Sequence, residues 1–387
     1  MILLAGLLGL WWLATVGLLL GSAGLACRHP WKRGRAFGNV GLATSAMAEV
    51  AVETDTPISI LVPLREESEA ESEANAALME LDYPACEILF SAKRRHDDEG
   101  TGLPPQLRGE GFRVAFIPTT CRPGWNPKLA NLVEPIVAAT YELILVKDAA
   151  TFLPPHALRA MIAALGPGVG LVSAIPIARR PRGFAAQVEA ALINTYGARM
   201  LSALSALGGG AGIGAAMLFR RGDLERAGGL SAIGAAIADD HALAKLLAGL
   251  GLRIVLASAT VDQELGARSL REIWRRHLRW AICRRLEEPL AFWAEPFTGL
   301  AAACLASLGA AHSLDIPPVA MLLATMLLWP VVEILLAALR GWPLSPATPL
   351  AILARELAMP ALWLNALLAR RIVWGAAAIP VSTRRRP

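Results

Sequence analysis

Residues 58–64, ISILVPL, decide the fold class of this chain. The run is almost continuously apolar and ends at Pro63, which is typical of a strand buried on both faces of a parallel sheet. Comparable runs follow at 87–92 (EILFSA), 112–117 and 142–146, and helical stretches separate them. This alternation predicts an α/β fold with an open, mostly parallel sheet.

The same pattern continues with further strands at 170–175, 215–219 and 252–258. Between the first two of these lie an alanine-rich helical region, 183–207, and a glycine-rich segment, 208–214 (GGGAGIG). The glycines match neither a P-loop nor a dinucleotide-binding spacing. We therefore interpret the segment as a flexible loop that lets the backbone approach a ligand or a membrane.

Acidic residues follow the predicted strands near the points where the strands end. Glu66 follows the first strand, and Asp148 comes directly after the fourth. Asp97 and Asp98 lie in the polar loop after the second strand. Ligands of open α/β sheets bind at the carboxyl ends of the strands, so we expect these four side chains to belong to one binding site.

A second acidic pair, Asp239 and Asp240, lies in residues 237–244 (IADDHALA), where an apolar run meets a helical one. Acidic pairs at a helix start also have a purely structural use, because capping and dipole interactions stabilise a helix by roughly 0.5–2 kcal/mol. Here the pair accompanies the strand-end carboxylates and an arginine-tryptophan cluster at 275–280 (RRHLRW). This combination favours a catalytic site over a helix cap.

The two ends of the chain are strongly apolar, and hydrophobic residues make up 55% of the whole sequence. Residues 2–25 carry no charge and are long enough to span a bilayer core of ~30 Å. Basic residues follow this run, which indicates a signal-anchor helix with a cytoplasmic domain after it and not a cleaved signal peptide. The basic residues are Arg28, His29, Lys32, Arg33 and Arg35.

Two further membrane spans are predicted at 297–314 and 316–339. A third candidate, 350–368, is interrupted by Arg355 and Glu356, which would lie at the membrane edge or pair inside the helix bundle. Three C-terminal spans would leave the arginine-rich tail outside, so the number of crossings stays open and 350–368 is a candidate re-entrant or interfacial segment.

Residues 268–288 have helical apolar spacing, with Arg271, Arg275, Arg276 and Arg279 on the other face and two tryptophans. Such a cationic amphipathic helix is typical of the membrane interface. We thus divide the chain into a signal anchor (1–27), a connector (28–56), a catalytic domain (57–265), an interfacial helix (266–295) and a C-terminal membrane region (296–387).

Composition excludes several classes of partner. The net charge of +5 suits cytoplasmic anchoring, and no basic stripe interleaved with aromatic residues suggests nucleic-acid binding. The five cysteines show no CxxC spacing, so the sequence predicts neither a zinc site nor a disulfide framework.

Five sequence motifs, taken in order, resemble the ceramide glucosyltransferase family, which is family 21 of the glycosyltransferases. They are residues 81–99 (LDYPACEILFSAKRRHDDE), 124–132 (GWNPKLANL), Asp148, 237–245 (IADDHALAK) and 276–280 (RHLRW). The resemblance covers residues 55–285, and the bacterial hopanoid-associated glycosyltransferase shares much of it. It implies a GT-A fold, a UDP-sugar donor (UDP-glucose foremost), Mg²⁺ or Mn²⁺, an inverting mechanism and a lipid hydroxyl acceptor.

The resemblance also assigns roles by position. Asp240 would be the general base, Asp148 would bind the metal and the sugar nucleotide, and Lys128 would pair with the diphosphate. Asp97 or Asp98 would contact the uracil or ribose. The nucleotide-sugar site as a whole would comprise Glu66, Asp97, Asp98, Lys128, Asp148, Asp239, Arg276, Arg279 and Trp280, with the last three also lining the path of the acceptor.

Two features depart from the family pattern. The usual DxD metal motif reads Asp148-Ala149-Ala150, so its second carboxylate is missing. A histidine of the animal members, in the helical region before the glycine-rich loop, is replaced near Gly197. The first departure bears on metal ligation and the second on acceptor contacts.

The favoured function is therefore transfer of a sugar from a UDP-sugar to ceramide, giving a β-glycosyl lipid at the cytoplasmic face of a bacterial inner membrane. The alternative acceptor is a hopanoid (bacteriohopanetetrol), with N-acetylglucosamine or another sugar. A non-enzymatic alternative, a decayed membrane scaffold, predicts loss of the acidic base or of RHLRW, and both are present. A processive polysaccharide synthase would need more spans to form a channel.

Overall fold

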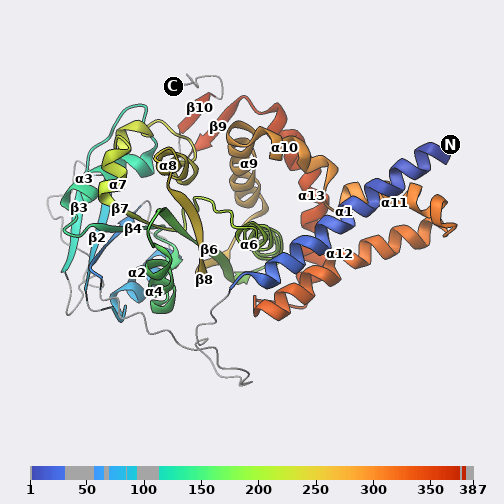
Figure 1. The fold of residues 1–387 in the computed structure, drawn as a ribbon, viewed down its shortest axis with the longest axis horizontal. Coiled ribbons are helices and arrows are strands. Elements are labelled where there is room, and N and C mark those ends of the chain that lie inside the picture. Colours follow the sequence, from blue (N-terminus) through green and yellow to red (C-terminus); the bar gives the residue numbers. More distant parts are fainter. Residues whose placement is uncertain are drawn as a thin grey trace. The chain divides into compact units, whose positions relative to one another are not determined.

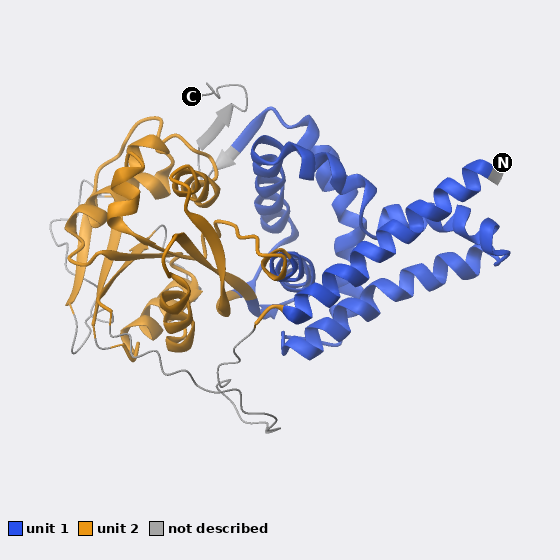
Figure 2. Ribbon diagram, in the orientation of Figure 1, with its two compact units in different colours: residues 1–28, 178–203, 265–387 blue, residues 29–177, 204–264 orange. Residues whose placement is uncertain are grey.

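The computed structural model of the 387-residue chain describes residues 2–30, 56–64, 69–83, 85–93, 113–374 and 377–380. Three predicted site residues, Glu66, Asp97 and Asp98, lie outside the described residues. The chain forms two compact units, both discontinuous in sequence (Figure 2). Unit 1 comprises Met1–Arg28, Ala178–Ala203 and Leu265–Pro387, and unit 2 comprises His29–Ile177 and Leu204–Glu264.

A mixed eight-stranded sheet, in the order β3-β2-β1-β4-β7-β6-β8-β5, confirms the predicted α/β class. The strands are β1 (Ile58–Pro63), β2 (Cys86–Lys93), β3 (Arg113–Thr119), β4 (Leu143–Lys147), β5 (Thr151–Phe152), β6 (Val169–Arg182), β7 (Ala216–Arg220) and β8 (Arg253–Ala267). β1 to β4 are mutually parallel, whereas β7 is antiparallel to both β4 and β6. β6 and β8 begin in unit 2 and end in unit 1.

Helices cover both faces of the sheet in unit 2 (Figure 1). One face packs against α2 (Glu69–Met79) and α4 (Pro155–Ala164), and the other against α3 (Pro127–Ala138), α7 (Arg221–Arg226) and α8 (Asp239–Ala248). Successive side chains of β1 alternate between the two hydrophobic clusters, with Ile60 in the first and Leu61 in the second. Burial on both faces explains why the strand is apolar along nearly its whole length.

Unit 1 consists mainly of helices. They are α1 (Ile2–Arg28), α5 (Phe184–Ala191), the π-helix η2 (Leu192–Ala198), α6 (Arg199–Ala206), α9 (Leu270–Glu287), α10 (Pro289–Ala294), α11 (Leu300–Leu314), α12 (Pro318–Arg340) and α13 (Thr348–Leu368). The predicted helical region 183–207 is thus helical but contains a π-helix, a feature often found at functional sites. A hairpin of β9 (Arg371–Trp374) and β10 (Ala377–Pro380) follows α13.

Three described helices are long and apolar enough to cross a membrane: Leu3–Arg28, Pro318–Arg340 and Thr348–Leu368. A fourth candidate is a broken span, Pro289–Phe297 with Leu300–Leu314, whose two parts are bent by 46°. The 15 residues of α11 reach only about 22 Å, too short for a bilayer core. The predicted span 297–314 coincides with the second part of this bent pair, and Thr298 and Gly299 separate the two parts.

The charges that interrupt α13 form ion pairs inside unit 1. The guanidinium of Arg355 donates to both carboxylate oxygens of Glu333 on α12, at 2.9 and 3.0 Å, and to Glu356 at 2.5 Å. Thr195 of the π-helix donates to Glu333 at 2.5 Å, and Glu356 accepts the backbone N–H of Leu300 at 2.8 Å. Of the two predicted alternatives, pairing inside the bundle is the one observed.

Removing one partner of this network leaves a buried charge uncompensated. Arg355→Leu is expected to destabilise the protein by about 3–5 kcal/mol, whereas adding Glu333→Gln should restore part of the loss. Thermal unfolding in detergent compares the two variants with the wild type. An Arg355→Leu protein of unchanged stability would contradict the assigned network.

Candidate active site

The start of α3 places Lys128 next to the segment before α8. Asn126 caps the helix, since its side chain accepts the backbone N–H of Lys128 at 2.9 Å, and Pro127 occupies the first helical position. The Asn126 amide donates to the carbonyl of Ala236 at 3.0 Å. One side chain thus fixes the distance between α3 and the residues that lead into Asp239.

Lys128 lies at the centre of a cluster of acceptors. Its ammonium contacts Asp148 Oδ1 at 2.7 Å and Asp239 Oδ2 at 3.0 Å, and donates to the Gly214 carbonyl at 3.3 Å. These three acceptors match the three hydrogens of an ammonium group. Burial alone would lower the pKa of Lys128, but the charges of Asp148 and Asp239 hold it above its ordinary value. The lysine therefore stays charged and offsets part of the negative charge of its two partners.

Asp240, the predicted base, lies beside this cluster at the start of α8. Its Oδ2 accepts the backbone N–H of Gly214 at 3.0 Å, and its Oδ1 accepts that of His241 at 2.8 Å. Burial, followed by the charge of Asp239, raises the pKa of Asp240 to about 6 against the opposing effect of Lys128. Asp240 is therefore a carboxylate at neutral pH but a stronger base than an ordinary aspartate.

A buried lysine that the sequence reading missed shapes the turn carrying Asp148. Lys147 is fully buried, and its ammonium donates to the backbone carbonyls of Asp148 (3.2 Å), Ala149 (3.3 Å) and Thr151 (2.6 Å). Burial lowers the pKa of Lys147 to about 7. The buried Lys147 ammonium thus stabilises the turn after β4 through three backbone carbonyls. In this turn the second carboxylate of a DxD motif is absent.

Asp148 is the residue expected to hold a metal. Among the residues that the structure describes, no group of three or more His, Cys, Asp or Glu side chains could hold a metal ion. The Asp148 side chain is, however, 46% exposed at the end of β4. Mg²⁺ commonly binds through one or two carboxylates together with substrate phosphates. Asp148 therefore fits a site that a bound diphosphate would complete.

The glycine-rich loop is packed against its own chain. A Cβ atom on Gly212 would lie 2.0 Å from the backbone oxygen of Asp240, and one on Gly210 would lie 2.0 Å from that of Ile254. Close packing against the protein's own backbone therefore requires glycine at these two positions. They allow the loop to touch α8 and β8, and the loop in turn presents the Gly214 amide to Asp240.

The RHLRW motif lies on α9 in unit 1. Glu189 of α5 contacts Arg276 Nη1 at 3.2 Å and His277 Nε2 at 3.5 Å, and the ring of Trp280 packs edge-to-face with that of His277 at 4.7 Å. The buried face of α9 comprises Ile273, His277, Ala281 and Ile282. Arg276 was predicted to lie on the polar face of the helix with three other arginines. It instead points toward the buried carboxylate of Glu189.

Both ends of α9 are also fixed. Ser269 and Glu272 form a capping box at its start. Near its end, Arg284 pairs with Glu295 at 2.5 Å, and Arg285 donates to the carbonyls of Ala366 (2.6 Å), Leu367 and Ala369 (2.9 Å) at the end of α13. The helix is therefore held by contacts other than those of Glu189.

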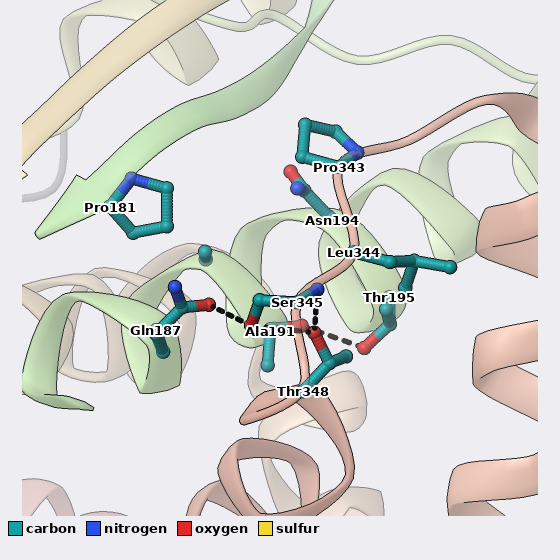
Figure 3. A pocket seen from close by; sticks show the side chains of 10 residues that line it. Pro181, Gln187, Ala191, Asn194, Thr195, Pro343, Leu344, Ser345 and Thr348 are labelled. Carbon is teal, nitrogen blue, oxygen red and sulfur yellow. Dashed lines mark hydrogen bonds between the residues drawn. The ribbon is translucent and has the colours of Figure 1, made fainter. Parts of the chain in front are cut away.

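Unit 1 also contains a cavity of about 70 Å³ between α5, the π-helix and the loop before α13 (Figure 3). Its polar groups are bonded to protein: Ser345 donates to Gln187 at 3.0 Å, and Asn194 bonds the backbone N–H and carbonyl of Ala178. This volume suits about two water molecules. We assign no substrate to it.

The structure brings together Lys128, Asp148, Asp239 and Asp240 in unit 2, as predicted, and places Arg276, Arg279 and Trp280 on one helix of unit 1. A parallel β3-β2-β1-β4 half-sheet followed by an antiparallel strand, with an aspartate at the end of β4, is a GT-A-like arrangement. The sequence model of Glycosyl transferase family 21 matches residues 13–386, so the chain belongs to this family.

Two relatives are ceramide glucosyltransferases of Caenorhabditis elegans. Ceramide glucosyltransferase 1 is 25% identical over 55% of this chain and 47% of its own length. Ceramide glucosyltransferase 3 is 27% identical over 65% of this chain and 56% of its own length. The chain thus matches about half the length of these relatives.

Solved structures with similar folds include the mannosyltransferase PcManGT from Pyrobaculum calidifontis in complex with GDP-Man and Mn²⁺ (21% identity, 93% of this chain and 98% of that one, TM-score 0.48). Another is glucosyl-3-phosphoglycerate synthase from Mycobacterium tuberculosis in complex with Mn²⁺, UDP and phosphoglyceric acid (17% identity, 59% and 75%, TM-score 0.34).

The close contact of Gly212 can be tested by stability alone. Gly212→Ala is expected to destabilise the protein by about 1–3 kcal/mol, because the new methyl group overlaps the Asp240 carbonyl. Gly166→Ala is the matched control, since a Cβ there meets nothing within 4 Å, and its stability should be unchanged or slightly higher. Equal thermal unfolding of both variants would contradict the packed-loop assignment.

Proposed function

We propose that the protein is a membrane-bound inverting glycosyltransferase that moves a sugar, with glucose favoured, from a UDP-sugar to the primary hydroxyl of a lipid of the ceramide type. The observation that carries the proposal is Asp240, a carboxylate with a raised pKa beside the Lys128–Asp148–Asp239 cluster, in a family 21 chain with membrane-length helices. The names of the two relatives support ceramide as acceptor and glucose as sugar.

Asp240 would act as the general base. As the lipid hydroxyl oxygen attacks the anomeric carbon, its proton passes to the Asp240 carboxylate while the bond from the sugar to the UDP oxygen breaks. The products are a β-glycosyl lipid, UDP and protonated Asp240, which returns its proton to water. General-base catalysis of this kind contributes typically 10²–10⁴-fold to a rate, and the amides of Gly214 and His241 orient the carboxylate.

On the donor side, Asp148 would hold Mg²⁺ or Mn²⁺, and the cation would neutralise charge on the leaving diphosphate. Lys128 is fully engaged by protein acceptors, which favours a role in keeping Asp148 and Asp239 in place over direct pairing with the diphosphate. Other residues proposed to contact the nucleotide sugar are Glu66, Asp97, Asp98, Asp239, Arg276, Arg279 and Trp280. The two arginines would bind its phosphates, which guanidinium groups match well.

The lipid acceptor requires a site that meets the bilayer. We propose that the catalytic domain, residues 57–265, faces the cytoplasm of a bacterial inner membrane and that α9 lies at the interface. Exposed apolar side chains on the neighbouring α10 support this location: Leu290 is 88% exposed and Trp293 is 52% exposed. Trp293 also packs against Trp363 of the membrane-length helix α13.

A transfer assay tests the function. Labelled UDP-glucose, UDP-galactose and UDP-N-acetylglucosamine are offered with Mn²⁺ and either ceramide or a hopanoid alcohol to the protein in detergent micelles. We expect transfer of glucose to ceramide, and Asp240→Asn should lose on the order of 10²–10⁴-fold in rate while it still binds the donor.

The matched control is Glu225→Gln, a change on an exposed carboxylate of unit 2, which should transfer at the wild-type rate. Transfer to the hopanoid alone would show that the acceptor is a hopanoid and not ceramide, and it would leave the proposed role of Asp240 unchanged. An Asp240→Asn protein as active as the wild type would refute the base assignment, and failure to bind any nucleotide sugar would favour the scaffold alternative.

The pKa of Asp240 predicts a pH dependence. The base must be unprotonated, so kcat/KM should be constant near pH 8, reach half its maximum near pH 6, and fall about ten-fold per pH unit below that value. The measurement is a pH profile of kcat/KM with the donor varied. A flat profile down to pH 5 would be incompatible with Asp240 as the base.

A further inference from the structure

Glu189 is a buried acidic residue to which the sequence motifs assign no role. It lies on the alanine-rich helix α5, and its side chain is 0% exposed. Its Oε1 faces Arg276 Nη1 at 3.2 Å and His277 Nε2 at 3.5 Å, and its Oε2 lies 3.9 Å from Arg268 Nε. All these residues belong to unit 1.

The surroundings keep this carboxylate charged. Burial by itself raises the pKa of a carboxyl group, but His277 and Arg276 pull the pKa of Glu189 below its ordinary value. An ionised carboxylate inside a protein requires such partners, because desolvation without them is unfavourable. The attraction is mutual, so Glu189 restrains the Arg276 guanidinium that compensates its charge.

Glu189 contacts the first two residues of the RHLRW motif. Arg276 bonds Glu189 directly, and its side chain remains 24% exposed. His277 lies between Glu189 and Trp280, whose ring meets the imidazole edge-to-face. A flexible arginine loses much rotamer freedom when it binds a phosphate, and fixing it beforehand reduces that loss.

We propose that Glu189 is a positioning residue that fixes Arg276 for recognition of the diphosphate of the donor. This inference rests on the proposed function, in which Arg276 binds the donor phosphates. A role in holding α9 itself is less favoured, because Arg284–Glu295 and the contacts of Arg285 with α13 hold the helix independently.

The first test is UDP binding by titration calorimetry in detergent with Mn²⁺, which needs no lipid acceptor. Glu189→Gln, nearly equal in shape but neutral, should raise the Kd of UDP about ten-fold. The KM of the UDP-sugar should rise in parallel, with kcat and the KM of the lipid little changed. Glu295→Gln, which removes a second carboxylate that pairs with an arginine of α9 and is only 13% exposed, is the matched control and should leave the Kd of UDP unchanged.

A double-mutant cycle separates positioning from general stability. In an Arg276→Ala background, Glu189→Gln should cause no further loss of UDP affinity, because its effect acts through Arg276. Glu189→Asp, which retains the charge, should keep most of the affinity and serves if the glutamine variant fails to fold.

Each outcome bears on one of the two hypotheses. Wild-type affinity in Glu189→Gln, or multiplicative losses in the cycle, would overturn the positioning role while the proposed function stands. Absence of UDP binding by the wild type would instead reject the proposed function, and the positioning role with it.

Discussion

The ammonium group of Lys128 is the interaction on which the candidate site depends. It joins Asp148 at the end of β4 to Asp239 at the start of α8, and the Gly214 carbonyl completes its set of acceptors. Without this cation, Asp148, Asp239 and Asp240 would repel one another in a partly buried space. With it, Asp148 and Asp239 share an ion-pair partner, while Asp240 has a raised pKa and oxygens oriented by backbone amides. In the proposed mechanism, this cation separates the base, Asp240, from the carboxylates assigned to the donor.

Much of the fold could be predicted because its signals are local. Continuous apolar runs predicted the parallel strands, and the position of Asp148 after a strand predicted the place of the site. Both signals are contained in a few consecutive residues. Strands β6 and β8 extend well past their predicted ends at 175 and 258, where polar residues obscure the strand pattern but the neighbouring strands still pair. The local sequence pattern therefore predicted where these strands lie, whereas contacts with neighbouring strands determine how long they are.

The missed features all rest on contacts between distant parts of the chain. Gly212 looked like a flexible position because only the fold brings the Asp240 carbonyl against it. Glu189 attracted no notice in an alanine-rich helix, although a lone acidic residue there is a usable signal for a buried partner. Lys147, at the end of an apolar strand, carried a similar signal. For Arg355 and Glu356 the sequence left two alternatives, and only the fold shows that they pair with Glu333 and with the start of α11.

The central claim is that one carboxylate, Asp240, deprotonates the acceptor in a single displacement. The most direct measurement is the anomeric configuration of the first glycolipid formed from an α-linked UDP-sugar, determined by proton NMR of the isolated product. A single displacement predicts a β-glycoside. An α-glycoside would contradict the account, because retention needs a nucleophile in addition to the base.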